Sequence, residues 1–202
     1  MIKLPVRDGR KNKKRKVKKI MNFKKTLAFM LALCICALLL CSCNKNNNEE
    51  IPDGMQLVTS EYLDSKFFVP KDWTPEITTG TLVAKASDNS NVSIQKMAVS
   101  GTYKTADEYF RTDYFPKLTN TFKNIVLLEE ECSTENQKFG TVGNYAVKYV
   151  YTVESDGSVY KIMQYFSVYS GYLYIMTYTA EQSVFSNHLE EITEIVNNFV
   201  YG

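Results

Sequence analysis

One stretch in the second half of the chain constrains the fold most, because it predicts three consecutive strands of an antiparallel sheet. In Tyr145–Val153, apolar or aromatic side chains fall at every second position, which places them on one face of a strand. Two further β-like runs follow, Val159–Val168 and Tyr172–Thr179. The links between the runs, Asp156-Gly157 and Ser170-Gly171, have the residue types of tight hairpin turns.

The last of these strands is apolar on both faces. Its side chains divide between one face (Leu173 and Ile175) and the other (Tyr172, Tyr174, Met176 and Tyr178). A strand of this kind belongs in a sheet that is covered on both sides. We therefore predict an α+β fold with a central antiparallel sheet and helices on both of its faces, an α/β/α sandwich.

Shorter strands are predicted earlier in the chain, at Gln56–Thr59, Lys66–Val69, Thr81–Ala86, Val92–Val99 and Ile125–Leu128. Within Val92–Val99 the apolar positions change phase, because Val92 and Ile94 are followed by Met97 and Val99. One extra residue in a strand shifts the phase in this way. We therefore predict a β-bulge near Gln95-Lys96.

Two capping boxes predict the starts of helices. Thr105-Ala-Asp-Glu108 would open a helix that carries several aromatic residues, and Pro116 is expected to end or kink it because proline lacks the backbone donor. Thr179-Ala-Glu-Gln182 would open a closing helix. The apolar residues of this second helix recur at 3.6-residue spacing, at Phe185, Leu189, Ile192, Ile195, Val196 and Phe199.

The charges of the chain are segregated along its length. Residues 1–42 contain 12 of the 24 Lys and Arg residues and a single acid, Asp8. Residues 43–202 therefore contain 12 basic and 21 acidic side chains, a formal net charge of −9. An acidic surface does not neutralise phosphates, so we expect no binding to nucleic acid.

A bacterial lipoprotein signal is predicted near the N-terminus. An apolar run from Leu27 to Leu40 has the length of a signal-peptide core and is shorter than a spanning helix needs. It ends in Leu40-Cys41-Ser42-Cys43, which resembles a lipobox, with Ser42 as the small residue before the cleavage site. Lipid on Cys43 would then hold the protein to the extracytoplasmic face of a cell membrane. The alternative is an uncleaved apolar anchor.

These patterns divide the chain into three parts. Residues 1–42 would be a basic leader and signal peptide, with Met1 or Met21 as the start. Residues 43–54 would be the lipidated cysteine and a disordered polar tether, because their side chains cannot bury apolar area. Residues 55–202 would form a single folded domain.

Few residues of this domain offer chemistry. His188, the single histidine, falls on the apolar stripe of the closing helix, beside Phe185 and Ile192, so we expect a half-buried packing role. Cys132 follows three glutamates, which would raise the pKa of its thiol and reduce its nucleophilicity. If Glu129–Glu131 were part of a strand, only Glu129 and Glu131 would share a face, and a solvated edge is the better interpretation than a metal site.

The sequence contains no phosphate loop, dinucleotide fingerprint, calcium loop or serine-hydrolase elbow. Gly140-Thr-Val-Gly143 is predicted to be a turn. We therefore predict no cofactor, no metal site and no catalytic residue. The 14 tyrosines would either fill the two sheet faces or line a ligand surface, and the first interpretation is favoured.

The run Phe67-Phe68-Val69-Pro70-Lys71-Asp72-Trp73 resembles the opening motif F-x-(I/V)-P-x-x-W of the PsbP-like family. That family includes a photosystem II extrinsic subunit, Mog-type Ran-binding proteins and DcrB-type lipoproteins. The ending is also similar, from Tyr172 to Ala180 and through Phe185 to Asn198-Phe199, although Asn198 replaces the usual serine. The resemblance covers roughly residues 54–202. It implies a sheet between helices and no shared activity.

Together these features favour a non-enzymatic, membrane-anchored lipoprotein that binds an envelope protein or a surface ligand. One alternative is an assembly or stress factor for a membrane complex. A second alternative, of a different class, is a hydrolase that uses His188 with a carboxylate or serine partner. The sequence leaves the ligand and the oligomeric state open.

Overall fold

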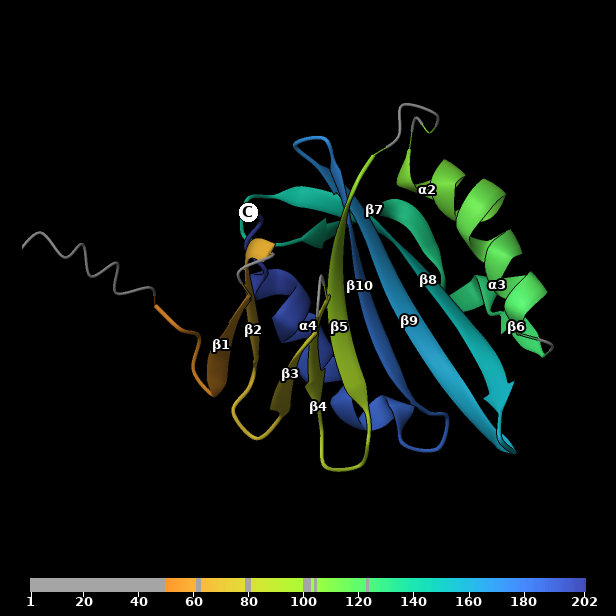
Figure 1. Cartoon of the computed structure of the whole chain (residues 1–202), viewed down its shortest axis with the longest axis horizontal. Helices are drawn as coiled ribbons and strands as arrows, with labels where there is room; N and C mark the ends of the chain where they lie inside the picture. Colours follow the sequence, from red (N-terminus) through yellow and green to blue (C-terminus); the bar gives the residue numbers. More distant parts are fainter. Residues whose placement is uncertain (1–49, 61–62, 79–80, 100–102, 104, 123) are drawn as a thin grey trace, which may run out of the picture. The chain divides into compact units, whose positions relative to one another are not determined.

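Three long antiparallel strands form the centre of the sheet in the computed structural model (Figure 1). They are β8 (Asn144–Ser155), β9 (Ser158–Tyr169) and β10 (Tyr172–Glu181). The structure describes residues 50–60, 63–78, 81–99, 103, 105–122 and 124–202. The predicted leader, Ser42 and Cys43 lie outside these residues.

Two tight turns join the three central strands. The turn residues have φ of 52° and 82° at Asp156-Gly157, and of 50° and 81° at Ser170-Gly171. Positive φ at both central residues is the type I′ turn, whose twist matches that of the strands it joins. Both predicted hairpins are therefore confirmed.

Five further strands complete an antiparallel sheet within the described residues. They are β3 (Thr74–Thr78), β4 (Thr81–Lys85), β5 (Asn91–Ala98), β6 (Ile125–Leu127) and β7 (Ser133–Phe139). The order across the sheet is β3-β4-β5-β10-β9-β8-β6, and β7 also pairs with β8. Both β6 and β7 pair with β8 because they occupy opposite ends of this long strand.

One face of the sheet is covered by α4 (Leu189–Asn198) and by a separate hairpin of β1 (Met55–Ser60) and β2 (Leu63–Pro70). Reciprocal backbone hydrogen bonds of 2.9 and 3.1 Å join Lys66 of β2 to Val200 after α4. The core on this face includes Phe67, Val69, Trp73, Leu82, Ile94, Tyr174, Met176, Tyr178, Ile195 and Phe199. The apolar residues of the motif from Phe67 to Trp73 therefore pack in the core.

The opposite face is covered by one continuous helical segment. It consists of α2 (Ala106–Tyr109), a π-helical turn (Phe110–Tyr114) and α3 (Phe115–Thr121). Phe110 is fully buried and stacks on Tyr149, with 3.4 Å between the ring centroids. The core on this face includes Phe110, Val147, Tyr149, Tyr151, Val153, Phe166, Leu173 and Ile175. The predicted sandwich is confirmed.

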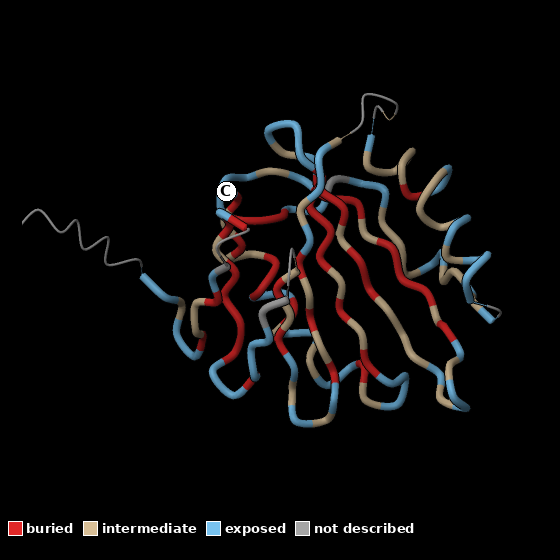
Figure 2. Tube along the Cα trace, viewed as in Figure 1, coloured by how far each residue is buried: buried red, intermediate tan, exposed pale blue. Residues whose placement is uncertain are grey.

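Residues 50–202 form one compact unit, and both cores lie completely inside it. Figure 2 shows the buried residues running along the central strands. A unit with its own closed core can fold by itself, so residues 50–202 can be produced as an isolated domain. In the described part of the chain, no helix is both long and apolar enough to cross a lipid bilayer.

The predicted β-bulge near Gln95-Lys96 is wrong. The pairing of β5 with β10 is regular from Asn91 to Ala98. The apolar positions change phase because the strand supplies apolar side chains to one face of the sheet near its start and to the opposite face near its end. Val92 and Ile94 face the α4 core, whereas the end of the strand at Met97 faces the side covered by α2. In a sheet covered on both sides, a phase change needs no extra residue.

The second capping box is also wrong. Thr179 pairs within β10, and the chain then makes a 3₁₀ turn at Phe185–His188 before α4 begins. Long strand pairing outweighs the local capping preference here. The first box is confirmed, because the Thr105 hydroxyl accepts a hydrogen bond of 3.0 Å from the Glu108 amide.

Pro116 does not end the helical segment that contains it, so this alternative of the expectation is wrong. It lies in the first turn of α3, directly after the π-helical turn. In that turn the Phe115 amide donates to the carbonyl of Phe110, five residues earlier. The wider turn relieves the steric conflict that a proline ring creates with the carbonyl four residues before it.

Candidate functional site

A row of apolar side chains crosses the sheet on the α2 side. Met97 on β5 lies opposite Leu173 on β10, which lies opposite Val168 on β9. Tyr145 on β8 continues this row, two residues before Val147 on the same face. Leu173 is buried, but Met97, Val168 and Tyr145 remain 42%, 43% and 55% exposed. Helix α2 therefore leaves part of this face open.

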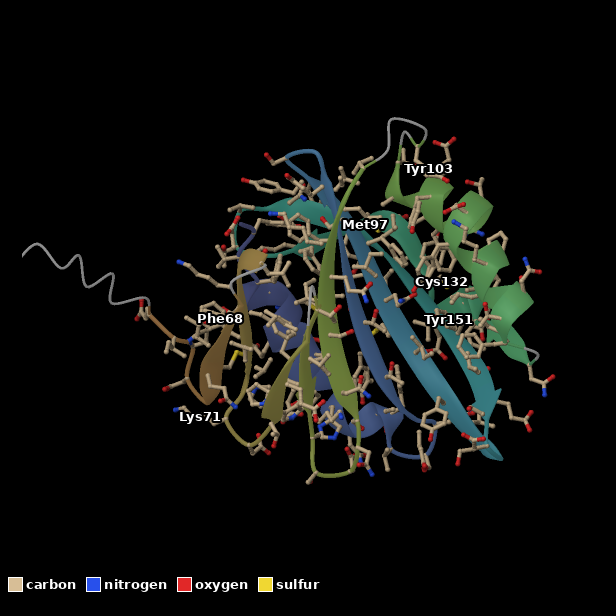
Figure 3. The ribbon with its side chains drawn as sticks, in the orientation of Figure 1. Phe68, Lys71, Met97, Tyr103, Cys132 and Tyr151 are labelled. Atoms are coloured by element: carbon tan, nitrogen blue, oxygen red, sulfur yellow. The ribbon has the colours of Figure 1, made fainter. Side chains whose placement is uncertain are left out.

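Two hollows lie over this row, on either side of the start of α2. The first has a volume of about 350 Å³ and is lined by Met97, Val99, Tyr103, Tyr109, Val168 and Leu173, among others. The second has a volume of about 400 Å³ and is lined in part by Thr134, Tyr145, Val147, Phe166 and Val168. Thr105, Ala106 and Val168 line both hollows. We call the two hollows together the α2 groove. Figure 3 labels Met97 and Tyr103, at the end of the sheet where it lies.

Aromatic rings form one wall of the first hollow. Tyr103 and Tyr109 pack edge to face, with 5.1 Å between the ring centroids. The Tyr109 hydroxyl points at the Met97 sulfur, at 3.8 Å. Burial and the charge of Asp113 raise the pKa of Tyr109, so its hydroxyl is neutral at physiological pH. The wall therefore offers apolar area and polarisable atoms without charge.

The charged groups in the groove lining, Asp113 and Lys117 in the first hollow and Asp107 in the second, are paired. Asp113 bonds Lys117 at 2.7 Å, and Asp107 bonds Arg111 at 3.1 Å and also accepts from the Tyr149 hydroxyl. The bond to Lys117 lowers the pKa of the Asp113 carboxyl. Because each aspartate already holds a basic partner, the groove presents apolar area and no isolated charge. An apolar groove whose charged groups are already paired is suited to binding a partner or ligand.

The contacts of His188 differ from those that the sequence predicts. Its Nε2 bonds Asp88 at 3.1 Å, its Nδ1 bonds Glu191 at 2.5 Å, and its ring packs against Trp73. It is half-buried, as predicted, but it joins the turn after β4 to α4 and does not simply pack on the apolar stripe. Both nitrogens hold carboxylates, so neither is left to take a proton from a nucleophile. This geometry does not support the hydrolase alternative.

The glutamates before Cys132 form a 3₁₀ turn and not a strand. Glu129 pairs with Arg111 at 3.5 Å and Glu131 pairs with Lys161 at 2.6 Å, so these carboxylates bridge to other elements. Among the described residues, no three His, Cys, Asp or Glu side chains gather closely enough to hold a metal ion.

The Cys132 thiol is half-buried. It donates to the Leu128 carbonyl at 3.3 Å and accepts from the Val150 amide at 3.4 Å. Burial, followed by the charge of Glu129, raises the pKa of the thiol above its usual value. The predicted direction is confirmed, although burial is a larger cause than the glutamates.

Solved structures with a similar fold are known, although no family model and no curated protein matches the sequence. The cyanobacterial PsbP of Synechocystis sp. PCC 6803 is 13% identical, with a TM-score of 0.54 over 73% of this chain and 93% of that one. The Ran-binding protein Mog1p of Saccharomyces cerevisiae is 11% identical, with a TM-score of 0.52 over 72% and 94%. The domain has the PsbP-like fold. A protein of Bacteroides thetaiotaomicron is 14% identical, with a TM-score of 0.50 over 74% of this chain and 49% of that one.

Several of the tyrosines pack in the two cores of this fold. Tyr149, Tyr151, Tyr174 and Tyr178 are buried in the two cores, as the favoured interpretation predicted. Tyr103, Tyr109 and Tyr145 line the α2 groove instead, and they are the tyrosines that an occupant of this groove would contact. The feature of the sequence that indicates the groove is the phase change in Val92–Val99, because it turns Met97 toward the α2 side.

Proposed function

We propose that this protein is a non-enzymatic binding module, anchored to the extracytoplasmic face of a cell membrane by lipid on Cys43. We further propose that the α2 groove is its binding surface. The observation that carries this proposal is the exposed apolar floor of the groove, at Met97, Val168 and Tyr145. Solvent-exposed apolar area concentrated in a concave site marks a binding surface more often than chance exposure does.

Two further observations support a binding role. The ring nitrogens of His188 are both occupied by carboxylates, so the single histidine is not available as a general base. The yeast protein with the same fold is described as Ran-binding, which means that a protein of this fold can bind another protein. Because fold alone does not transfer function, the groove itself remains the main argument.

The groove is tested by site-specific photocrosslinking in cells. A photoreactive residue at position 168, on the groove floor, should form adducts in the membrane fraction. Position 159 is the matched control, because Val159 is also on β9 and is 42% exposed, against 43% for Val168, but lies outside the groove. Adducts at both positions, or at neither, would contradict the groove as the binding surface.

The anchor is tested separately. Cys43→Ala should abolish incorporation of labelled lipid and leave the protein as an unprocessed precursor or release it into the medium. Cys41→Ala is the control, because Cys41 lies two residues earlier and has Leu40 in place of a small residue before it. Its labelling should equal that of the wild type. Unchanged labelling of Cys43→Ala would refute lipid attachment at this residue.

A further inference from the structure

The floor of the α2 groove consists of side chains on a sheet face and not of an open strand edge. At the apolar row β10 pairs with β5 and with β9, and β8 pairs with β7, whereas the pairing of β4 with β5 ends at Gln95 and that of β8 with β9 ends at Val147 and Phe166. The backbone amides and carbonyls of these strands lie in the plane of the sheet, so an occupant that lies on the floor of the groove contacts side chains and has no row of backbone groups to pair with. It must bring a backbone whose hydrogen bonds are already satisfied, which a helix does.

The length of the groove suits anchors on one face of a helix. From β5 to β8 the apolar row crosses three strand spacings, which amount to about 14 Å. Side chains at positions i, i+4 and i+7 of a helix span about 10 Å, because the rise is about 1.5 Å per residue. The two hollows on either side of Thr105 and Ala106 would then receive the outer anchors.

The net charge of the domain indicates which kind of molecule would bind in the groove, whether it brings a helix or another apolar surface. Residues 43–202 carry 12 basic and 21 acidic side chains, a formal net charge of −9. Two copies of the domain would repel each other, and so would the domain and an anionic lipid surface. Asp113, paired with Lys117, lines the first hollow, and Asp107, paired with Arg111, lines the second, so carboxylates are also present in the groove lining. A cationic partner is therefore favoured.

We propose that the α2 groove binds a basic amphipathic helix of a partner protein, with apolar anchors at i, i+4 and i+7 and Lys or Arg on the flanks. This rests on the proposed function, since it names the partner class of the same groove. The anchors would contact Met97 and Leu173 in the first hollow and Tyr145 in the second.

The test is a selection from a displayed library of 16-residue peptides on the isolated domain of residues 50–202, after a cooperative thermal transition has established that it is folded. We expect enriched peptides with a net positive charge and apolar residues at helical spacing. Their affinity should fall about tenfold or more in Val168→Asp, which places a charge on the groove floor. It should stay unchanged in Val159→Asp and should weaken as salt is raised.

Tyr145→Asp provides a second groove variant, should Val168→Asp fail to fold, because Tyr145 is 55% exposed. Enrichment of acidic peptides, no enrichment, or binding that survives both groove variants would overturn the proposal. Two further arms use phosphatidylserine-containing vesicles and sedimentation of the domain alone. Vesicle binding or dimerisation that Val168→Asp abolishes would assign the groove to a membrane or a second copy. Crosslinking at position 168 without such peptides would leave the proposed function standing and remove only this partner.

Discussion

The imidazole ring of His188 lies perpendicular to the indole ring of Trp73, with 5.2 Å between the ring centroids and 87° between the planes. Trp73 is buried and is the single tryptophan of the sequence. The same imidazole is hydrogen-bonded to Asp88 and Glu191. A group that changes charge near neutral pH therefore touches the one residue that dominates the fluorescence of the protein.

Tryptophan fluorescence should report the titration of His188. Burial lowers the pKa of His188, but the hydrogen bonds and charges of Glu191 and Asp88 outweigh it and raise the pKa above 6.5. Because a protonated imidazole quenches a neighbouring indole, emission should fall as pH decreases, with a midpoint above pH 6.5. His188→Gln should remove this transition. A midpoint at or below 6.5 would show that the carboxylates do not dominate.

The stability of the domain should depend on the same contacts. Since the folded-state pKa of His188 is raised, its contribution is fully present below about pH 6.5 and is lost as pH rises through the folded pKa. The pKa of Asp88 is lowered despite burial, through bonds to Ser90 and His188, so its contribution is lost as pH falls below its ordinary value of 3.8. The His188 contacts therefore stabilise most between these limits.

Urea unfolding of wild type and His188→Gln at pH 6, 7, 8 and 9 checks this expectation. The difference in free energy of unfolding should shrink as pH rises, because only the wild type loses the charged pairs. Titration of all other groups is common to both proteins and cancels in the difference. A difference that is constant over this range would mean that His188 contributes by packing alone.

The architecture could be predicted because it is encoded in local patterns. The two-faced apolar pattern of Tyr172–Thr179 required cover on both sides, and Asp156-Gly157 fixed a hairpin. The strands Thr74–Thr78 and Ser133–Phe139 were missed, since the first contains Pro75 and the second is mostly polar. Such strands form because neighbouring strands pair with them, and their own residues give no signal.

The candidate site could not be predicted in the same way. His188 and Asp88 are 100 residues apart, so the sequence does not reveal their contact. The groove depends on which apolar residues α2 leaves uncovered. Val168 and Phe166 lie on the same face of β9, yet Val168 is 43% exposed and Phe166 is fully buried. That difference is set by the position of a distant helix.

Gly140 lies close to the backbone of Phe199, so alanine should destabilise the domain more at Gly140 than at the nearby Gly143. Gly140 and Gly143 have φ of 74° and 71°, so alanine at either position would be strained by about 1–2 kcal/mol. At Gly140 a β-carbon would also lie 2.6 Å from the Phe199 carbonyl oxygen, whereas at Gly143 it would meet nothing within 4 Å. Gly140→Ala should lose about 1–3 kcal/mol more stability than Gly143→Ala.

Chemical denaturation of the two variants measures this difference. The comparison is matched because both residues belong to the same turn between β7 and β8. The backbone of Gly140 is also fixed by its amide, which donates to the Val196 carbonyl at 2.9 Å, so it cannot easily move away from Phe199. Equal losses in the two variants would indicate that the junction between this turn and the C-terminal segment adapts freely.

Gln164 is a buried polar residue whose loss should be costly. It is 2% exposed, accepts from the Tyr151 hydroxyl at 2.9 Å, and donates to the hydroxyls of Tyr114 and Thr177 at 2.8 and 2.9 Å. Gln164→Leu keeps the volume but leaves the Tyr151 hydroxyl without its acceptor in the core. We expect a loss of about 2–4 kcal/mol, since an unsatisfied buried polar group costs about 1–3 kcal/mol and more than one group is affected.

Gln95→Leu on β5 is the control for this substitution, because Gln95 is exposed and its change should alter stability by about 0.5 kcal/mol or less. Tyr151→Phe separates the parts of the network. It removes only the hydroxyl that donates to Gln164, so its loss should be smaller than that of Gln164→Leu. If Gln164→Leu were as stable as the wild type, apolar contact between α3 and the sheet would replace the network without cost, and the helix would be held over the sheet by Phe110 and its neighbours alone.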